Sequence, residues 1–191
     1  MSLVKVSGNA SGTGTLTIAA PNTNSDYTLT LPTNTGTLIS TASLQVVTAN
    51  KTDTFSTSST SFTDITSLSV SITPSSASSK ILIMAYISAQ GTPGATVTQH
   101  RLVRGATAIA VGDAASSRTQ ASAGLYSSVS DTTQQATIVF LDSPATTSST
   151  TYKCQMRVNG STGYVNRTSS DTDNTNNART ISTITVMEIA A

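Results

Sequence analysis

The stretch "LSVSITPSSASSKILIMAYIS", residues 68–88, contains two strand patterns of different kinds. In its first part Leu, Val and Ile alternate with Ser and Thr up to Pro74, which predicts a strand with one buried and one exposed face. In its second part, residues 80–87, apolar side chains occupy both faces. The short, β-branched run favours a central strand covered on two sides over a helix. We therefore expect these two strands to form the core of a β domain.

Further strand patterns follow toward the C-terminus. A hairpin is expected to turn at Arg104 and Gly105, where two strand-like runs meet. The strand 152–158 places Tyr, Cys, Met and Val on one face and Lys, Gln and Arg on the other. The apolar positions change phase between Val186 and Met187, which indicates a bulge or a strand with two apolar faces.

The number and spacing of these strands indicate the fold class. About eight strand candidates follow Leu44, at intervals typical of sandwiches. Apolar residues at helical spacing are not found, so we expect very little helix. The sequence predicts an all-β protein, with an antiparallel, jelly-roll-like β-sandwich over residues 44–191 and a separate segment over residues 1–43.

The composition excludes several classes of function. Ser and Thr dominate, with 31 Ser and 37 Thr among 191 residues, while 10% of residues are charged and the formal net charge is +1. Because no basic stripe or interleaved aromatic residues are present, nucleic-acid binding is not expected. No apolar run is long enough for membrane insertion and no secretory signal is found, so synthesis in a cytoplasm is expected. Cys154 is the single cysteine, which leaves no internal disulfide.

The N-terminal segment contains short alternating pieces with few residues to bury. In "GTLTIAAPNTNSDYTLTLPTNTGTLIS", residues 14–40, Leu16 and Ile18 share one face of a predicted strand, and Leu29 and Leu31 share one face of another. A two-stranded hairpin is marginally stable by itself in water. This segment therefore needs either the rest of its own chain or other copies of itself.

Residues for catalysis are few and scattered. His100 lies within a strand pattern, and we interpret it as a strand histidine with satisfied hydrogen bonds rather than a base or ligand. Cys154 falls on a predicted core face, where a small buried apolar role is expected. No nucleophilic triad or phosphate-binding loop is found. We expect no enzymatic activity, although Asp142, Asp171, Asp173 and Glu188 supply carboxylates that a hydrolase would need.

The loop 169–179 has some features of a calcium site. Asp171 and Asp173 are two residues apart and precede Asn174, and hard cations bind oxygen ligands at alternating positions. However, the glycine and the closing glutamate of such loops are missing. We interpret the segment as a solvated loop and predict no metal and no cofactor.

A carbohydrate or carboxylate site is a second possibility at the surface. Arg101, Arg104, Arg157 and Arg167 have guanidinium groups that suit such ligands, if the fold brings them together. In the region of residues 159–177, Tyr164 is a candidate for stacking on a sugar, and Asn166 and Arg167 are candidates for bonding its hydroxyl groups. These three residues are the predicted receptor contacts.

The N-terminal stretch resembles short modules in the tail fibres and related appendages of tailed bacteriophages. In those modules a Tyr-x-Leu-Thr-Leu-Pro unit is followed by Gly-Thr-Leu. The matching residues here are Tyr27, Leu29, Thr30, Leu31, Pro32, Gly36, Thr37 and Leu38. Further on, "SITPSSASSKILIMAYIS", "RLVRGATAIAVG" and the ending "STITVMEIAA" resemble C-terminal domains of phage virion proteins.

This resemblance implies a homotrimeric, non-enzymatic virion component that is made in the host cytoplasm. Three N-terminal segments would turn Leu16, Ile18, Leu29 and Leu31 toward a common axis, as a stalk or attachment segment. The sandwich would form a trimeric knob for attachment to the host surface, so the expected partners are further copies, other virion proteins of the tail or capsid, and host cell-surface glycans.

Two alternatives stay open at this point. A trimeric capsid decoration or head-fibre protein fits the same length and architecture, since one end would bind capsid proteins while the knob projects. A carbohydrate-binding module is the alternative from a different class, and it predicts saturable glycan binding through the loops.

Overall fold

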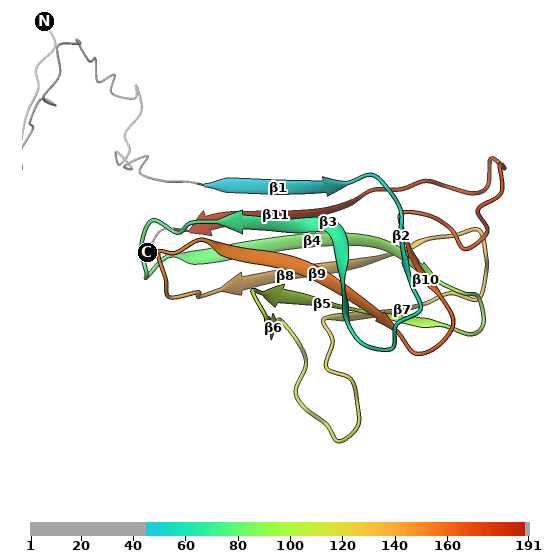
Figure 1. The fold of residues 1–191 in the computed structure, drawn as a ribbon, viewed down its shortest axis with the longest axis horizontal. Helices are drawn as coiled ribbons and strands as arrows, with labels where there is room; N and C mark the ends of the chain where they lie inside the picture. The colour runs from blue at the N-terminus through green and yellow to red at the C-terminus, as the bar shows by residue number, and fades with distance from the viewer. Residues whose placement is uncertain (1–44, 190–191) are drawn as a thin grey trace, which may run out of the picture. The chain divides into compact units, whose positions relative to one another are not determined.

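The computed structural model describes residues 45–189, which fold as antiparallel β-sheets without a helix (Figure 1). The predicted segment 1–43, with Leu16, Ile18, Leu29 and Leu31, lies outside the described residues. In the part of the chain that is described, no helix is long and apolar enough to cross a membrane.

Two sheets make up the domain, and we call them sheet A and sheet B. Sheet A contains β1 (Val46–Lys51), β2 (Phe55–Thr57), β4 (Lys80–Gly91), β8 (Gln134–Asp142), β10 (Gly163–Val165) and β11 (Ser182–Ile189). Sheet B contains β3 (Thr63–Ile72), β5 (Val97–Arg104), β6 (Thr107–Ile109), β7 (Ala123–Tyr126) and β9 (Thr150–Val158). In sheet A, β4 is central, since β8 pairs with one of its edges and β11 and β10 with the other.

The strand pairing is nested, which defines a jelly roll. Leaving out the short β2, β6 and β10, the first strand pairs with the last, β1 with β11, and then β3 with β9, β4 with β8 and β5 with β7. All of these pairs are antiparallel. A long antiparallel hairpin rolled into two facing sheets has this order. The expected all-β sandwich is thus confirmed, and about eight main strands build it.

The core lies between the inner faces of the two sheets. Alternation places Leu68, Val70 and Ile72 of β3 inward, while the Ser residues between them are exposed. From β4, Ile81, Ile83 and other odd-numbered residues point into the same cluster and are fully buried. Fully burying one such aliphatic side chain stabilises the fold by roughly 1.5–3 kcal/mol. The sandwich therefore forms the core that its alternating strands predict.

Two sequence predictions need correction in this part of the fold. In β11 the pairing with β1 and β4 continues without a register shift, so no bulge separates Val186 from Met187. The alternative of a two-sided strand holds, because Val186 faces the core and Met187 the outer face. The irregularity instead lies in β3, where the register with β9 shifts between Asp64 and Ser69.

The strand β4 is central, as predicted, but the domain covers only one of its faces. Leu82 and Met84 are half-buried and Tyr86 is 38% exposed on the outer side. The prediction of cover on both sides is therefore wrong for the single chain. The predicted hairpin is confirmed: Arg104 pairs with Thr107, and the turn between them contains Gly105 with a positive φ of 59°.

A buried polar cluster joins the two sheets. Asp142 of β8 accepts two hydrogen bonds from Arg104 of β5, at 2.8 and 2.9 Å, and one from the hydroxyl of Tyr152 of β9, at 2.6 Å. Burial and the neighbouring carboxylate raise the pKa of Tyr152. This cluster ties one edge of sheet A to sheet B.

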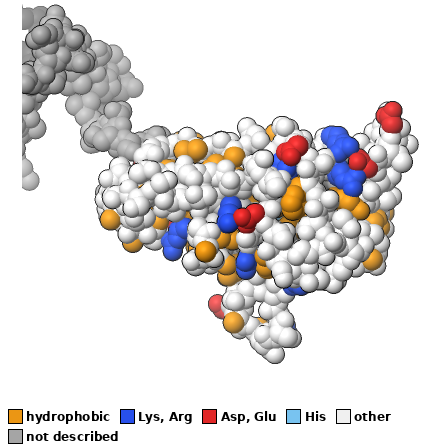
Figure 2. Space-filling model, viewed as in Figure 1, with side chains coloured by type: hydrophobic (Ala, Val, Ile, Leu, Met, Phe, Trp, Pro, Cys, Tyr) orange, Lys and Arg blue, Asp and Glu red, His pale blue; other side chains and the backbone are white. Residues whose placement is uncertain are grey.

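The surface seen in Figure 2 is mostly uncharged, with small groups of basic atoms beside acidic ones. Lys153 pairs with Asp64 in this way, at 2.7 Å, and the hydrogen bond from Lys153 is the main cause that lowers the pKa of Asp64. The low fraction of charged residues in the sequence is therefore also seen at the surface.

Candidate functional site

The predicted receptor contacts lie at and after β10. Tyr164 is half-buried in this strand, and the guanidinium group of Arg167 lies over its ring, with the Cζ atom 4.2 Å from the ring centroid. One face of the Tyr164 ring is thus already covered by the protein itself. The structure brings Tyr164 and Arg167 together in a contact within the protein, and their role as receptor contacts stays a prediction.

Asn166 has a different place from the one predicted. It is fully buried, with a positive φ of 61°. Its side-chain amide donates to the carbonyl oxygens of Lys51 at 2.7 Å and Asp53 at 2.9 Å, and accepts from the Ser182 hydroxyl at 2.6 Å. Because every hydrogen-bonding group of this amide faces inward, Asn166 holds the loop in place and does not lie at the surface.

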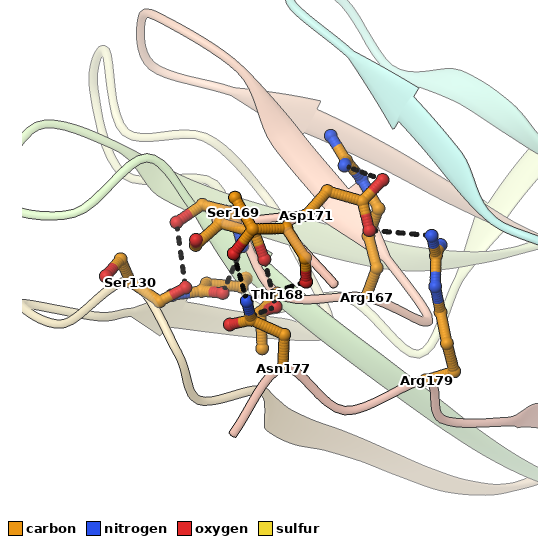
Figure 3. Close-up of polar contacts among 10 residues, drawn as sticks. Ser130, Arg167, Thr168, Ser169, Asp171, Asn177 and Arg179 are labelled. Atoms are coloured by element: carbon orange, nitrogen blue, oxygen red, sulfur yellow. Dashed lines mark hydrogen bonds and ion pairs between the residues drawn. The ribbon is translucent and has the colours of Figure 1, made fainter. Parts of the chain in front are cut away.

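Asp171 is paired with two arginines in the loop that follows (Figure 3). Its carboxylate oxygens lie 2.6 Å from Arg167 and 2.6 Å from Arg179. The amide of Asn177 closes the loop by donating to Thr172. Within residues 45–189, no three His, Cys, Asp or Glu side chains gather as metal ligands. The Asp171 carboxylate thus neutralises guanidinium groups, which compete with any cation.

His100 and Cys154 both lie inside the domain. His100 is fully buried on β5, where its Nε2 atom is 3.1 Å from the Thr98 hydroxyl, and burial lowers its pKa to about 4. Cys154 is fully buried, and burial raises the pKa of its thiol to about 12. A thiol with that pKa is not a nucleophile at neutral pH. The strand position of His100 and the buried apolar role of Cys154 are confirmed. The expectation that the hydrogen bonds of His100 are satisfied is wrong for its Nδ1 atom, which is buried without a partner among the described residues.

The four arginines named from the sequence divide into three places. Arg104 belongs to the buried cluster with Asp142, and Arg167 pairs with Asp171. Arg101 and Arg157 instead line one shared hollow on the outer face of sheet B. The fold therefore brings two of the four together.

A larger feature lies on the outer face of sheet A. Strand register places twelve side chains there in three rows of four. They are Val46, Met187, Leu82 and Leu141; Thr48, Thr185, Met84 and Val139; and Asn50, Thr183, Tyr86 and Thr137. We call this set the sheet A outer face. It contains no charged residue, and Val46, Val139 and Leu141 are 50%, 60% and 48% exposed.

Sequence reasoning missed this face, although its signal was present. The two-sided apolar pattern of residues 80–87 and the phase change at Met187 both come from it. The pattern of residues 80–87 was interpreted as a central strand covered on both sides. The phase change at Met187 was interpreted as a bulge or a strand with two apolar faces. Neighbouring strands had to be known before Leu141 and Val46 could be placed beside Leu82.

Comparison with known proteins finds no matching family model and no match among characterised proteins. Among solved structures, the chain is similar to one from the structure of infectious bursal disease virus, Gt strain, with 13% sequence identity and a TM-score of 0.44. The similar region covers 78% of this chain and 39% of the viral chain, so this chain spans less than half of its length. We assign the class from the strand order alone, as a jelly-roll β-sandwich domain.

Proposed function

We propose that this protein is a homotrimeric structural component of a bacteriophage virion, of the tail-fibre type, whose sandwich is a knob for attachment to the host surface. The observation that supports assembly is the sheet A outer face. Four strands about 4.8 Å apart and three rows about 6.7 Å apart give it an area on the order of 400 Å². Seven of its twelve side chains are apolar and lie next to one another, and contiguous exposed apolar surface often marks an interaction site.

A second copy of the chain is the occupant that fits this face best. The twelve residues of the face are aliphatic side chains, Thr, Asn50 and Tyr86, and none of them is charged. Lys80 lies one row beyond them at the end of β4, where it stays at the rim, so two copies meet without burying an unpaired ion. Gln45, the first described residue, continues the pairing beside β1, since its carbonyl accepts from the Glu188 amide at 2.9 Å.

The size of the face also limits the arrangement. A standard interface buries about 800 Å² on each partner, so loops beside the sheet must take part as well. In a threefold assembly each copy meets two neighbours, and edge strands β1 and β8 would lie at the two contacts. Burial there would also protect both sheet edges from unwanted pairing.

The virion role is supported by the resemblance of residues 14–41 to fibre modules and of the later segments to phage virion proteins. On this proposal the protein has no enzymatic activity and needs no cofactor. Its location would be the virion. The decoration-protein alternative differs only in its docking partner, so binding of purified protein to isolated tails or to empty capsids separates the two.

The test is Val139→Glu, which places a charge in the middle row of the face, on the edge strand β8. Because Val139 is 60% exposed, the variant is expected to fold, and light scattering should show a monomer where the unchanged protein is a trimer. Ser69→Glu is the matched control, on an exposed position of sheet B opposite Lys153, and should leave the trimer intact. A trimer that survives Val139→Glu would contradict the use of this face.

A further inference from the structure

The outer face of sheet B contains a hollow with two arginines. It is a shallow depression that is open to solvent, with a volume of about 550 Å³. Arg101 of β5 and Arg157 of β9 form its floor, and Ser61 and Phe62 come from the turn before β3. Thr119 and Gln120 come from the long connection between β6 and β7 and line it as well.

Neutral groups hold both guanidinium groups in place. Arg101 donates from Nε to Gln155 at 2.8 Å, and its Cζ atom lies 4.1 Å from the centroid of the Phe62 ring. Arg157 donates from Nη1 to Gln99 at 3.0 Å and also to the Thr119 hydroxyl. Both cations are therefore positioned without being neutralised.

No carboxylate among residues 45–189 forms an ion pair with either arginine. The nearby Asp64 is engaged by Lys153 at 2.7 Å and by the Gln155 amide at 2.5 Å. Two guanidinium groups therefore line the hollow without an ion-pair partner among the described residues.

We propose that this hollow binds an acidic saccharide through its carboxylate. The planar guanidinium fork matches a carboxylate, and the hydroxyl and amide groups of Ser61, Thr119 and Gln120 match sugar hydroxyls. The proposal names a ligand class for the host-surface attachment proposed above and rests on it for the source of the ligand. Binding itself is independent of oligomeric state.

The test is isothermal titration calorimetry, in which trigalacturonic acid is added to the full-length protein. Neutral maltotriose is titrated in the same way as the uncharged control. We expect saturable binding of the acidic sugar only, weakened by added salt. Arg101→Gln should weaken it by about tenfold or more, since hydrogen bonds to charged groups have that strength. Arg101→Lys, which keeps the charge but loses the fork, should also weaken it.

Arg118→Gln is the control, because it also removes one positive charge, and Arg118 precedes Thr119 and Gln120 in the chain but does not itself line the hollow. It should bind as the unchanged protein does. The proposal would be overturned if Arg118→Gln weakened binding as much as Arg101→Gln does. It would also be overturned if maltotriose bound as tightly as the acidic sugar, or if no saturable binding were seen. If sodium sulfate competes for the hollow as strongly as the acidic sugar does, the hollow binds oxyanions in general, and the proposal of a saccharide ligand is overturned. The mass of each variant in solution is measured in parallel, so that a failure of assembly is distinguished from a failure of binding.

Discussion

The two outer faces of the sandwich differ, although the same strand alternation builds both. On sheet B, outward positions hold Gln99, Arg101, Lys153 and Gln155, which hydrogen-bond across strands or to Asp64. On sheet A, the twelve residues of the outer face are mostly aliphatic side chains and Thr, and the charged Lys80 lies beyond them at the end of β4. The two faces therefore differ in charge and hydrogen bonding, and this difference is the basis of the two proposals made above.

The largest effect on stability is expected where the two sheets are tied together. Asp142→Ala removes the acceptor for the buried Tyr152 hydroxyl and the carboxylate of the part-buried Arg104 pair, which leaves Arg104 bonded, among the described residues, to the Ser143 carbonyl only. Because both interactions are lost together, the free energy of unfolding should fall by about 3–5 kcal/mol. Chemical denaturation measures it, with Asp131→Asn at an exposed position as the control. A loss no larger than that of the control would show that the sheets are held by apolar packing alone.

A smaller effect is expected from His100 on the inner face of sheet B. Burial lowers its pKa to about 4 from an ordinary value of 6.5. As pH falls below 6.5 the unfolded chain gains a proton that the folded chain does not, so stability falls until about pH 4. The total loss is on the order of 3 kcal/mol.

His100→Gln should remove this part of the pH dependence. The free energy of unfolding is measured against pH for the variant and for the unchanged protein, and the two slopes are compared. A loss of stability that is the same at every pH does not change the slope. Equal slopes for the variant and the unchanged protein would mean that His100 is protonated alike in both states.

The smallest effect is expected on the solvated outer face of sheet B. Lys153→Ala removes the exposed pair with Asp64 and should cost about 0.2–1 kcal/mol, less in high salt. Since the pKa of Asp64 is lowered, this contribution is present above the ordinary carboxyl pKa and is lost as pH falls below it. A loss as large as that for Asp142→Ala would contradict the view that this face is solvated.

Alternation in the sequence was sufficient to predict much of the fold. It placed Leu68 and Val70 inward, put Cys154 in the core and located the turn at Gly105, because these are local consequences of strand geometry. The nested pairing needs contacts between residues more than a hundred positions apart, such as Val46 with Met187. No local pattern specifies such contacts.

The candidate sites were harder to predict for the same reason. Asn166 is buried because it caps the backbone at Lys51 and Asp53, far away in the sequence. Only the fold shows that Arg101 and Arg157 share a hollow while Arg104 lies elsewhere. Residue type indicated the chemistry of these side chains, but the sheet register decided which of them meet.

The most direct test of the central claim is the mass of residues 44–191 in solution, measured by light scattering beside that of the full chain. If the sheet A outer face joins the copies, the shortened protein is a trimer, as is the full chain. A monomer of the shortened protein would contradict the claim. If the full chain also has a mass of 19.5 kDa, the homotrimeric fibre is excluded as well.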